Sequence, residues 1–155
     1  MKKQTLLGTL LGLSLLSSAA VAHIEQSEPL QSLRQSYFAL LGMTFGPMGD
    51  MVKGKIEWDN ALFTTWANDL NHAAQFGVER GFAPGSDNGM TRAKPNIWSN
   101  MDDFQSKLDN FRAAAASLAD IAAEGAPAAS REQFVATGGT CKACHDEYKS
   151  QDYLY

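Results

Sequence analysis

Apolar side chains recur every three or four residues in four segments of the chain, the spacing that lines one face of an α-helix. The first segment runs from about Glu28 to Met51 and has Pro29 in its first turn, where proline is favoured. The second runs from about Asp59 to Phe76, with Asp59 as the expected N-cap. Both segments are therefore predicted to be amphipathic helices.

The third and fourth segments follow a long interruption. Between residues 77 and 97 the periodicity fails, and recurring glycine and proline indicate one long loop. The third helix is expected to start at Ser99, with Asp102 in the acidic position of a capping box. The fourth is expected to open at Ser130, with Gln133 as its capping-box partner, and to continue into a cysteine-containing motif.

The order and length of these segments predict the fold class. Nothing in the chain has the pattern of a β-hairpin or of a βαβ unit. Four amphipathic helices, with short links and one long loop between the second and third, are typical of an up-down-up-down bundle. The protein is therefore predicted to be all-α, an antiparallel four-helix bundle.

The N-terminal residues have the pattern of a targeting segment. Two lysines precede an apolar stretch from Leu6 to Leu16, and the small residues of Ala20-Val21-Ala22 suit a cleavage site. The stretch is too short to span a membrane, which takes about 20 apolar residues. Residues 1–22 are expected to be a cleaved signal peptide, and residues 23–155 to form one domain exported to the periplasm.

The net charge of the chain argues against two classes of binding partner. The sequence has 13 basic and 17 acidic residues, so its net charge is −4. Removal of the signal peptide would take away two lysines and leave a charge of −6. Nucleic acid and anionic lipid repel an acidic protein, so neither is an expected partner, and no membrane contact is expected after cleavage.

The candidate chemistry lies in the motif Cys141-Lys142-Ala143-Cys144-His145. Two thiols at this spacing can bond the two vinyl groups of one haem, and the next histidine can reach the iron. A disulfide would leave His145 without a role, zinc needs about four ligands where three are nearby, and a redox dithiol would need βαβ surroundings. One covalent haem c is therefore predicted, with His145 as the axial ligand.

A second iron ligand would have to come from upstream, because no methionine or histidine follows His145. His72 is expected on the polar side of its helix, about 200° from the apolar stripe. His23 is expected to begin the mature chain, where residues are usually mobile. Neither histidine is a good candidate ligand.

Several further stretches make the chain resemble cytochrome c′, the class II c-type cytochromes. They are Arg34-Gln35-Ser36, residues 46–54, residues 82–87, residues 94–98 and residues 141–148. The resemblance implies a haem inside the bundle, bound to the fourth helix and covered on its distal side by the first.

The resemblance also implies roles for single residues. Arg34 and Gln35 would contact the haem propionates, and Ser86 and Asp87 would touch the haem from the loop. From the residues alone, Arg34 could instead be a surface ion-pair residue, and Ser86 and Asp87 would suit any turn. On the proximal side stands Lys149, where the family often has arginine, and lysine is not an equivalent donor.

Phe38 falls where the family places an apolar residue over the distal face of the iron, although an ordinary core aromatic would fit the same position. A phenyl ring cannot coordinate iron, so Phe38 there predicts a five-coordinate, high-spin haem. Low-spin relatives use a methionine of the first helix. Met43 is the nearest candidate here, but it lies about 140° around the helix from Phe38.

Two functions follow as expectations. A free sixth iron site favours binding of diatomic gases, chiefly nitric oxide and carbon monoxide, and a haem near the surface also suits one-electron transfer. The alternative is a six-coordinate electron-transfer cytochrome with a methionine ligand from the first helix. No distal acid–base pair accompanies Phe38, so the chain is not expected to be an enzyme.

The resemblance further implies a homodimer formed through the first two helices. The candidate surface residues, which could equally belong to the core, are Phe45, Met48, Ile56 and Phe63.

Overall fold

The computed structural model describes residues 29–154, and within this range every regular element is helical. Four helices are long: α1 (Pro29–Val52), α2 (Asn60–Ala74), α4 (Met101–Ala123) and α5 (Pro127–Tyr148). The segment between α2 and α4 holds a 3-10 helix, η1 (Val78–Phe82), and a single helical turn, α3 (Asn96–Ser99). The predicted all-α class and the long loop are confirmed.

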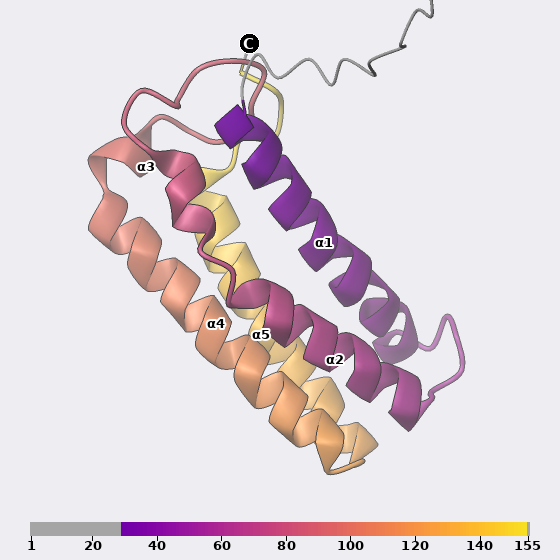
Figure 1. Ribbon diagram of the computed structural model, residues 1–155. Helices are drawn as coiled ribbons and strands as arrows, with labels where there is room; N and C mark the ends of the chain where they lie inside the picture. The colour runs from indigo at the N-terminus through magenta and orange to yellow at the C-terminus, as the bar shows by residue number, and fades with distance from the viewer. Residues whose placement is uncertain (1–28, 155) are drawn as a thin grey trace, which may run out of the picture.

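The four long helices lie side by side, and the loop before α4 crosses one end of the bundle (Figure 1). Helix α1 packs on α2 and on η1, α2 packs on α4, and α4 packs along α5. In contrast, α1 and α5 touch only sparsely. The bundle therefore has one open seam, between the first helix and the helix that carries the cysteine motif.

Two clusters of buried side chains form the core. The cluster near the α1–α2 connection contains Met48, Met51, Phe63, Leu70, Phe111, Leu118 and Phe134, with four buried alanines and partly buried neighbours around them. The cluster under the long loop contains Tyr37, Val78, Phe82, Ile97, Phe104, Leu108 and Tyr148. The open seam runs beside both clusters, so apolar residues line its inner side.

The predicted helix starts are confirmed at α2 and wrong at α4 and α5. The Asp59 carboxylate accepts a hydrogen bond from the Leu62 backbone N–H at 3.0 Å, as an N-cap does. The Ser99 hydroxyl instead donates to the Asn96 carbonyl, and α4 begins two residues later. Helix α5 begins at Pro127, because proline suits the first helical position and needs no N–H partner there. Ser130 is consequently buried inside the helix.

Two of the four candidate dimer residues are core residues. Met48 is 0% exposed and Phe63 is 1% exposed, so of the two alternatives left open by the sequence the core is the correct one for both. Phe45 is partly buried and stacks on Phe134, with ring centroids 4.2 Å apart. Only Ile56 is exposed.

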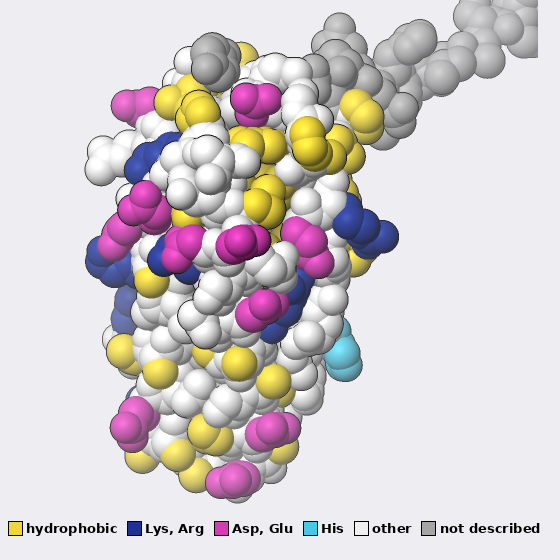
Figure 2. Space-filling view, turned by 90° about the vertical axis from the view of Figure 1, so that its left-hand side faces the viewer, with side chains coloured by type: hydrophobic (Ala, Val, Ile, Leu, Met, Phe, Trp, Pro, Cys, Tyr) yellow, Lys and Arg dark blue, Asp and Glu magenta, His cyan; other side chains and the backbone are white. Residues whose placement is uncertain are grey.

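The face of the molecule shown in Figure 2 carries interspersed charges of both signs. No helix within residues 29–154 combines the length and the apolar character needed to cross a membrane. The predicted signal peptide, residues 1–22, lies outside the described residues.

Candidate haem site

A cavity of about 680 Å³ occupies the open seam between α1 and α5. This volume is within the range of about 300–1,000 Å³ that is usual for cofactor and ligand pockets. Helices α1, α4 and α5, the long loop and the residues after α5 all contribute to its wall. The cavity is thus lined both by residues of the cysteine motif and by the candidate haem-contacting residues of the first helix.

Helix α5 presents both cysteines and the histidine of the motif to the cavity. Thr140, Cys141, Cys144, His145 and Tyr148 line it, a spacing that places them on one face of the helix. Both cysteines are free thiols and partly buried. Burial raises the pKa of the Cys144 thiol to about 11 and also raises the pKa of Cys141. Both sulfurs are therefore held as neutral thiols facing the space that a haem would fill.

The same geometry argues against the other uses of two cysteines. A reactive dithiol relies on a thiolate formed at low pKa, which is the opposite of the shift here. A zinc ion needs about four ligands, and within residues 29–154 no three histidine, cysteine or acidic side chains are grouped to hold a metal ion. Covalent attachment of a haem remains the use that fits.

His145 is partly exposed at the edge of the cavity. Burial of its ring, together with the positive charges of Lys149 and Arg92, lowers the pKa of this imidazole. Neutral imidazole is the form that binds iron. The surroundings of His145 therefore favour its role as an axial ligand.

Helix α1 forms the facing wall. Its cavity-lining residues recur every three or four positions: Gln31, Arg34, Gln35, Phe38, Leu41, Gly42 and Phe45. Phe38 is 39% exposed, and its ring stands edge-on to Tyr37 with centroids 5.1 Å apart. A core aromatic would be more fully buried, so the structure places Phe38 on the cavity wall rather than in the core.

Arg34 is the most deeply buried charged residue of this wall, at 4% exposed. Its guanidinium donates to the Gly81 carbonyl at 2.5 Å and to the Ser86 hydroxyl at 3.3 Å. It also lies 5.2 Å from the ring centroid of Phe82 and 5.6 Å from that of Trp98, which are cation–π distances. The surface ion-pair alternative for Arg34 is therefore wrong.

Ser86 and Asp87 do not line the cavity. Ser86 is buried and donates to the Ala83 carbonyl at 2.7 Å while accepting from Arg34. Asp87 is exposed. The predicted direct contact of these two residues with a haem is not found on the cavity wall, and Ser86 instead positions Arg34.

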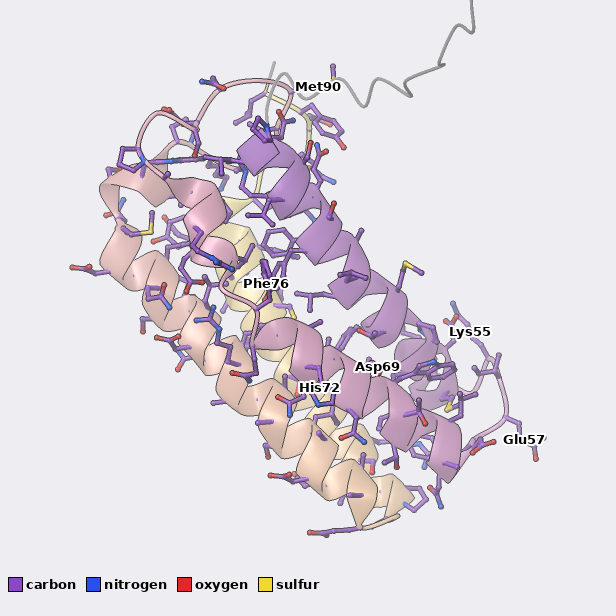
Figure 3. All side chains as sticks on the ribbon, in the orientation of Figure 1. Lys55, Glu57, Asp69, His72, Phe76 and Met90 are labelled. Carbon is purple, nitrogen blue, oxygen red and sulfur yellow. The ribbon has the colours of Figure 1, made fainter. Side chains whose placement is uncertain are left out.

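The remaining candidate ligands are outside the cavity. Met43 is 72% exposed, and Met48 and Met51 belong to the core cluster near the α1–α2 connection. His72 is exposed on the outer side of α2, as expected (Figure 3). Lys149, in contrast, does line the cavity next to His145.

Sequence reasoning missed several residues of the wall. Tyr148, three residues after His145, is buried and donates to the Asp103 carboxylate at 2.5 Å, which ties the end of α5 to the start of α4. Its position one turn after the motif was a usable signal. Arg92 and Tyr153 also line the cavity, but neither lies in a periodic segment.

The wall is amphipathic in the way that a haem requires. Apolar side chains from all four long helices surround most of the space, including Phe38, Leu41, Leu70, Phe104, Leu108 and Phe111. Apart from the titratable His145, every charged residue of the wall is a cation. These residues are Arg34, Arg92, Lys107 and Lys149. An apolar macrocycle that carries two carboxylates matches both parts of this lining.

Comparison with known proteins agrees with this fit. Residues 30–149 match the sequence model of the family described as Cytochrome C′. The chain is similar to cytochrome c′ of Cereibacter sphaeroides, with 34% identity over 95% of this chain and 97% of the relative.

Solved structures give the same result. The fold is similar to that of cytochrome c prime from Shewanella frigidimarina, with a TM-score of 0.76, 38% identity, and coverage of 79% of this chain and 95% of the other. It is also similar to a nitric oxide complex of a cytochrome c prime variant from Alcaligenes xylosoxidans, with a TM-score of 0.73, 31% identity, and coverage of 81% and 96%. The chain therefore belongs to the cytochrome c′ family, whose members carry covalently bound haem c.

Proposed function

We propose that this chain holds its haem through Cys141, Cys144 and the single axial ligand His145, binds nitric oxide and carbon monoxide, and also passes single electrons. One observation carries the proposal. Among the cavity-lining residues, His145 is the only histidine and there is no methionine. The haem supplies the redox chemistry and the gas-binding metal, and within residues 29–154 the cavity wall offers no second strong ligand for it.

The six-coordinate alternative has less support. A methionine ligand from α1 would have to be Met43, Met48 or Met51. Met43 points to solvent, while Met48 and Met51 are at most 2% exposed in the core cluster near the α1–α2 connection. Coordination would therefore require rotation of α1 or unpacking of that cluster.

The distal wall favours small, apolar ligands. Phe38 and Leu41 present hydrocarbon to the cavity, and neither can donate a hydrogen bond to a polar ligand. Crowding by the phenyl ring would exclude larger molecules, whereas a diatomic gas can fit beside it. The nitric oxide complex of the Alcaligenes xylosoxidans relative supports the same ligand class.

Electron transfer is supported by the position of His145, whose imidazole is partly exposed at the edge of the cavity. Catalysis of the peroxidase kind is not proposed, because that chemistry uses a distal acid–base pair and Phe38 has no such neighbour on the wall. We place the exported protein in the periplasm, where covalent haem and an N-terminal signal peptide occur together.

We also propose a homodimer through α1 and α2. The apolar side chains that these helices and their connection leave exposed support it: Leu40, Met43, Ile56 and Leu62. Replacement Met43→Glu should convert the dimer to monomer in sedimentation velocity, whereas Val135→Glu, equally exposed but on α5, should leave the dimer intact. An unchanged sedimentation coefficient in Met43→Glu would exclude this interface.

The gas-binding proposal is tested by optical titration of the ferrous protein with carbon monoxide and nitric oxide. We expect saturable spectral changes with both gases, and no change when the ferric protein is mixed with imidazole, which is too large to pass Phe38. A ferrous spectrum that carbon monoxide does not alter would show that a protein ligand blocks the site.

A further inference from the structure

The residues after α5 form a short ribbon with the long loop. The Lys94 backbone N–H donates to the Tyr148 carbonyl at 2.9 Å, and that of Ser150 donates to the Arg92 carbonyl at 2.8 Å. Farther along, the Leu154 N–H donates to the Thr91 carbonyl at 2.9 Å. The tail is thus paired with residues 91–94 along most of its length.

The side chain of Arg92 fixes the ribbon from the loop side. Its Nε donates to the Ser150 carbonyl at 2.9 Å, and its guanidinium also donates to the Gln151 carbonyl. These bonds hold the backbone immediately before Tyr153, and the Leu154 bond holds the backbone immediately after it. Tyr153 is therefore anchored on both sides.

This anchoring places Tyr153 on the cavity wall. The tail after α5, drawn in yellow, lies at the same end of the bundle as the first turn of α1 (Figure 1), and the Gln31 side chain of that turn donates to the Met90 carbonyl, which joins the loop to it. Met90 is at the same end of the molecule in Figure 3. Tyr153 consequently lies at the polar end of the cavity, the end formed by the first turns of α1.

Tyr153 supplies a further hydrogen-bond donor at that end. The Gln31 amide is bonded to Met90, and the Arg92 guanidinium is bonded to the tail. Tyr153 is 60% exposed, and its hydroxyl has no hydrogen-bond partner within residues 29–154. A haem in the cavity brings two carboxylates, and these need hydrogen-bond donors in addition to the cations of the wall.

We propose that Tyr153 is a haem-contacting residue, with its hydroxyl donating to a haem carboxylate and its ring covering that edge from solvent. The ribbon between residues 91–94 and 149–154 is then part of the binding site and not a loose terminus. The inference requires haem c in the cavity, but not a free sixth iron site or gas binding. The assignment of Tyr153 can therefore be wrong while gas binding is correct, and gas binding can be wrong while the assignment of Tyr153 is correct.

The test is a pair of variants, Tyr153→Phe and Tyr153→Leu, made in the haem-loaded protein. Tyr153→Phe removes only the hydroxyl, so the Raman band of the haem carboxylate bending mode should shift while the iron coordination bands stay unchanged. Negative charge on the carboxylate would be less neutralised, which favours the ferric state. The ferrous-to-ferric ratio at a fixed applied potential should fall about two- to five-fold.

Tyr153→Leu should lower that ratio further, because the ring no longer covers the haem edge. Leu154→Ala is the matched control, since Leu154 is the next residue of the tail and does not line the cavity. Arg92→Gln should lower the ratio as well, because it both releases the tail and removes a cation from the cavity wall. If Tyr153→Phe leaves the Raman band and the ratio at the wild-type values, or changes them only as Leu154→Ala does, the assignment is wrong.

Discussion

Arg34 of α1 donates to the backbone carbonyl of Gly81, 47 residues later in the chain, across 2.5 Å at the edge of the haem cavity. The contact is possible because Gly81 has no side chain. A Cβ atom there would stand 3.0 Å from Arg34 Cγ and 3.4 Å from the Leu30 carbonyl oxygen. The first helix and η1 are thus held at a separation that only glycine permits.

This close approach predicts opposite effects at two glycines. Gly81→Ala should destabilise the protein by about 1–3 kcal/mol, because Arg34 or the α1 backbone must shift. Gly139→Ala should stabilise α5 by up to about 1 kcal/mol, since nothing lies within 4 Å of its Cβ position. Urea denaturation of both variants gives the comparison. Equal stability of the two would show that the Gly81 contact is not tight.

Replacement of Arg34 by lysine or methionine distinguishes the contribution of its charge to stability from that of its planar guanidinium. Arg34→Lys keeps the positive charge but loses the fork that reaches Gly81 and Ser86 and lies near two aromatic rings. We expect a loss of about 2–4 kcal/mol for Lys, and a similar loss for Met, because these contacts and not the charge alone hold the loop. Thermal unfolding of both variants measures this loss of stability. An Arg34→Lys variant as stable as the wild type would show that the charge alone holds the loop.

The sequence predicted the helices better than their ends. Periodicity located all four long helices because burial of one face imposes that spacing. Ser99 and Ser130 are not N-caps, because the capping pattern takes account only of bonds within a few residues. The Ser99 hydroxyl donates to the Asn96 carbonyl instead, and α5 begins at Pro127, about one turn before Ser130. Which apolar residues of α1 and α2 face inward also depends on tertiary packing, which is why the sequence left Met48 and Phe63 open between the surface and the core.

The residues of the haem site also fall into two groups, those that a local sequence pattern identifies and those that only tertiary contacts bring to the cavity. The cysteine motif is local, so its residues were identifiable from spacing, whereas Phe38 was identified only through the resemblance to the family. Tyr153 and Arg92 reach the cavity through pairing of the tail with residues 91–94, a non-local contact with no sequence period. Ser86 was assigned to the haem, whereas its hydroxyl contacts Arg34.

Phe38 should control how fast gases enter. Phe38→Ala removes the ring from the cavity wall, so the second-order rate constant for carbon monoxide binding to the ferrous protein should rise at least about ten-fold, which corresponds to about 1.4 kcal/mol of steric barrier. Leu40→Ala is the control, because Leu40 is 55% exposed on the same helix and does not line the cavity. Stopped-flow absorbance gives both rates. Equal rates in the two variants would place the barrier elsewhere.

Tyr37 should make stability fall in alkali. Burial raises the pKa of Tyr37 to about 12, while the unfolded chain titrates near pH 10. The unfolded state therefore loses its proton first, so this contribution is complete below pH 10 and is lost as pH rises towards 12. It amounts to about 2 kcal/mol. Tyr37→Phe should show a shallower decline in the free energy of unfolding between pH 10 and 12, and an unchanged slope would mean that Tyr37 ionises freely when folded.

The free sixth iron site is tested most directly by resonance Raman spectroscopy of the purified, haem-loaded ferrous protein without added gas. A spectrum of five-coordinate, high-spin iron is expected, because within residues 29–154 His145 is the only histidine on the cavity wall and Phe38 cannot bind metal. A six-coordinate, low-spin spectrum would mean that a side chain of the protein occupies the second position, and would contradict gas binding at an open site.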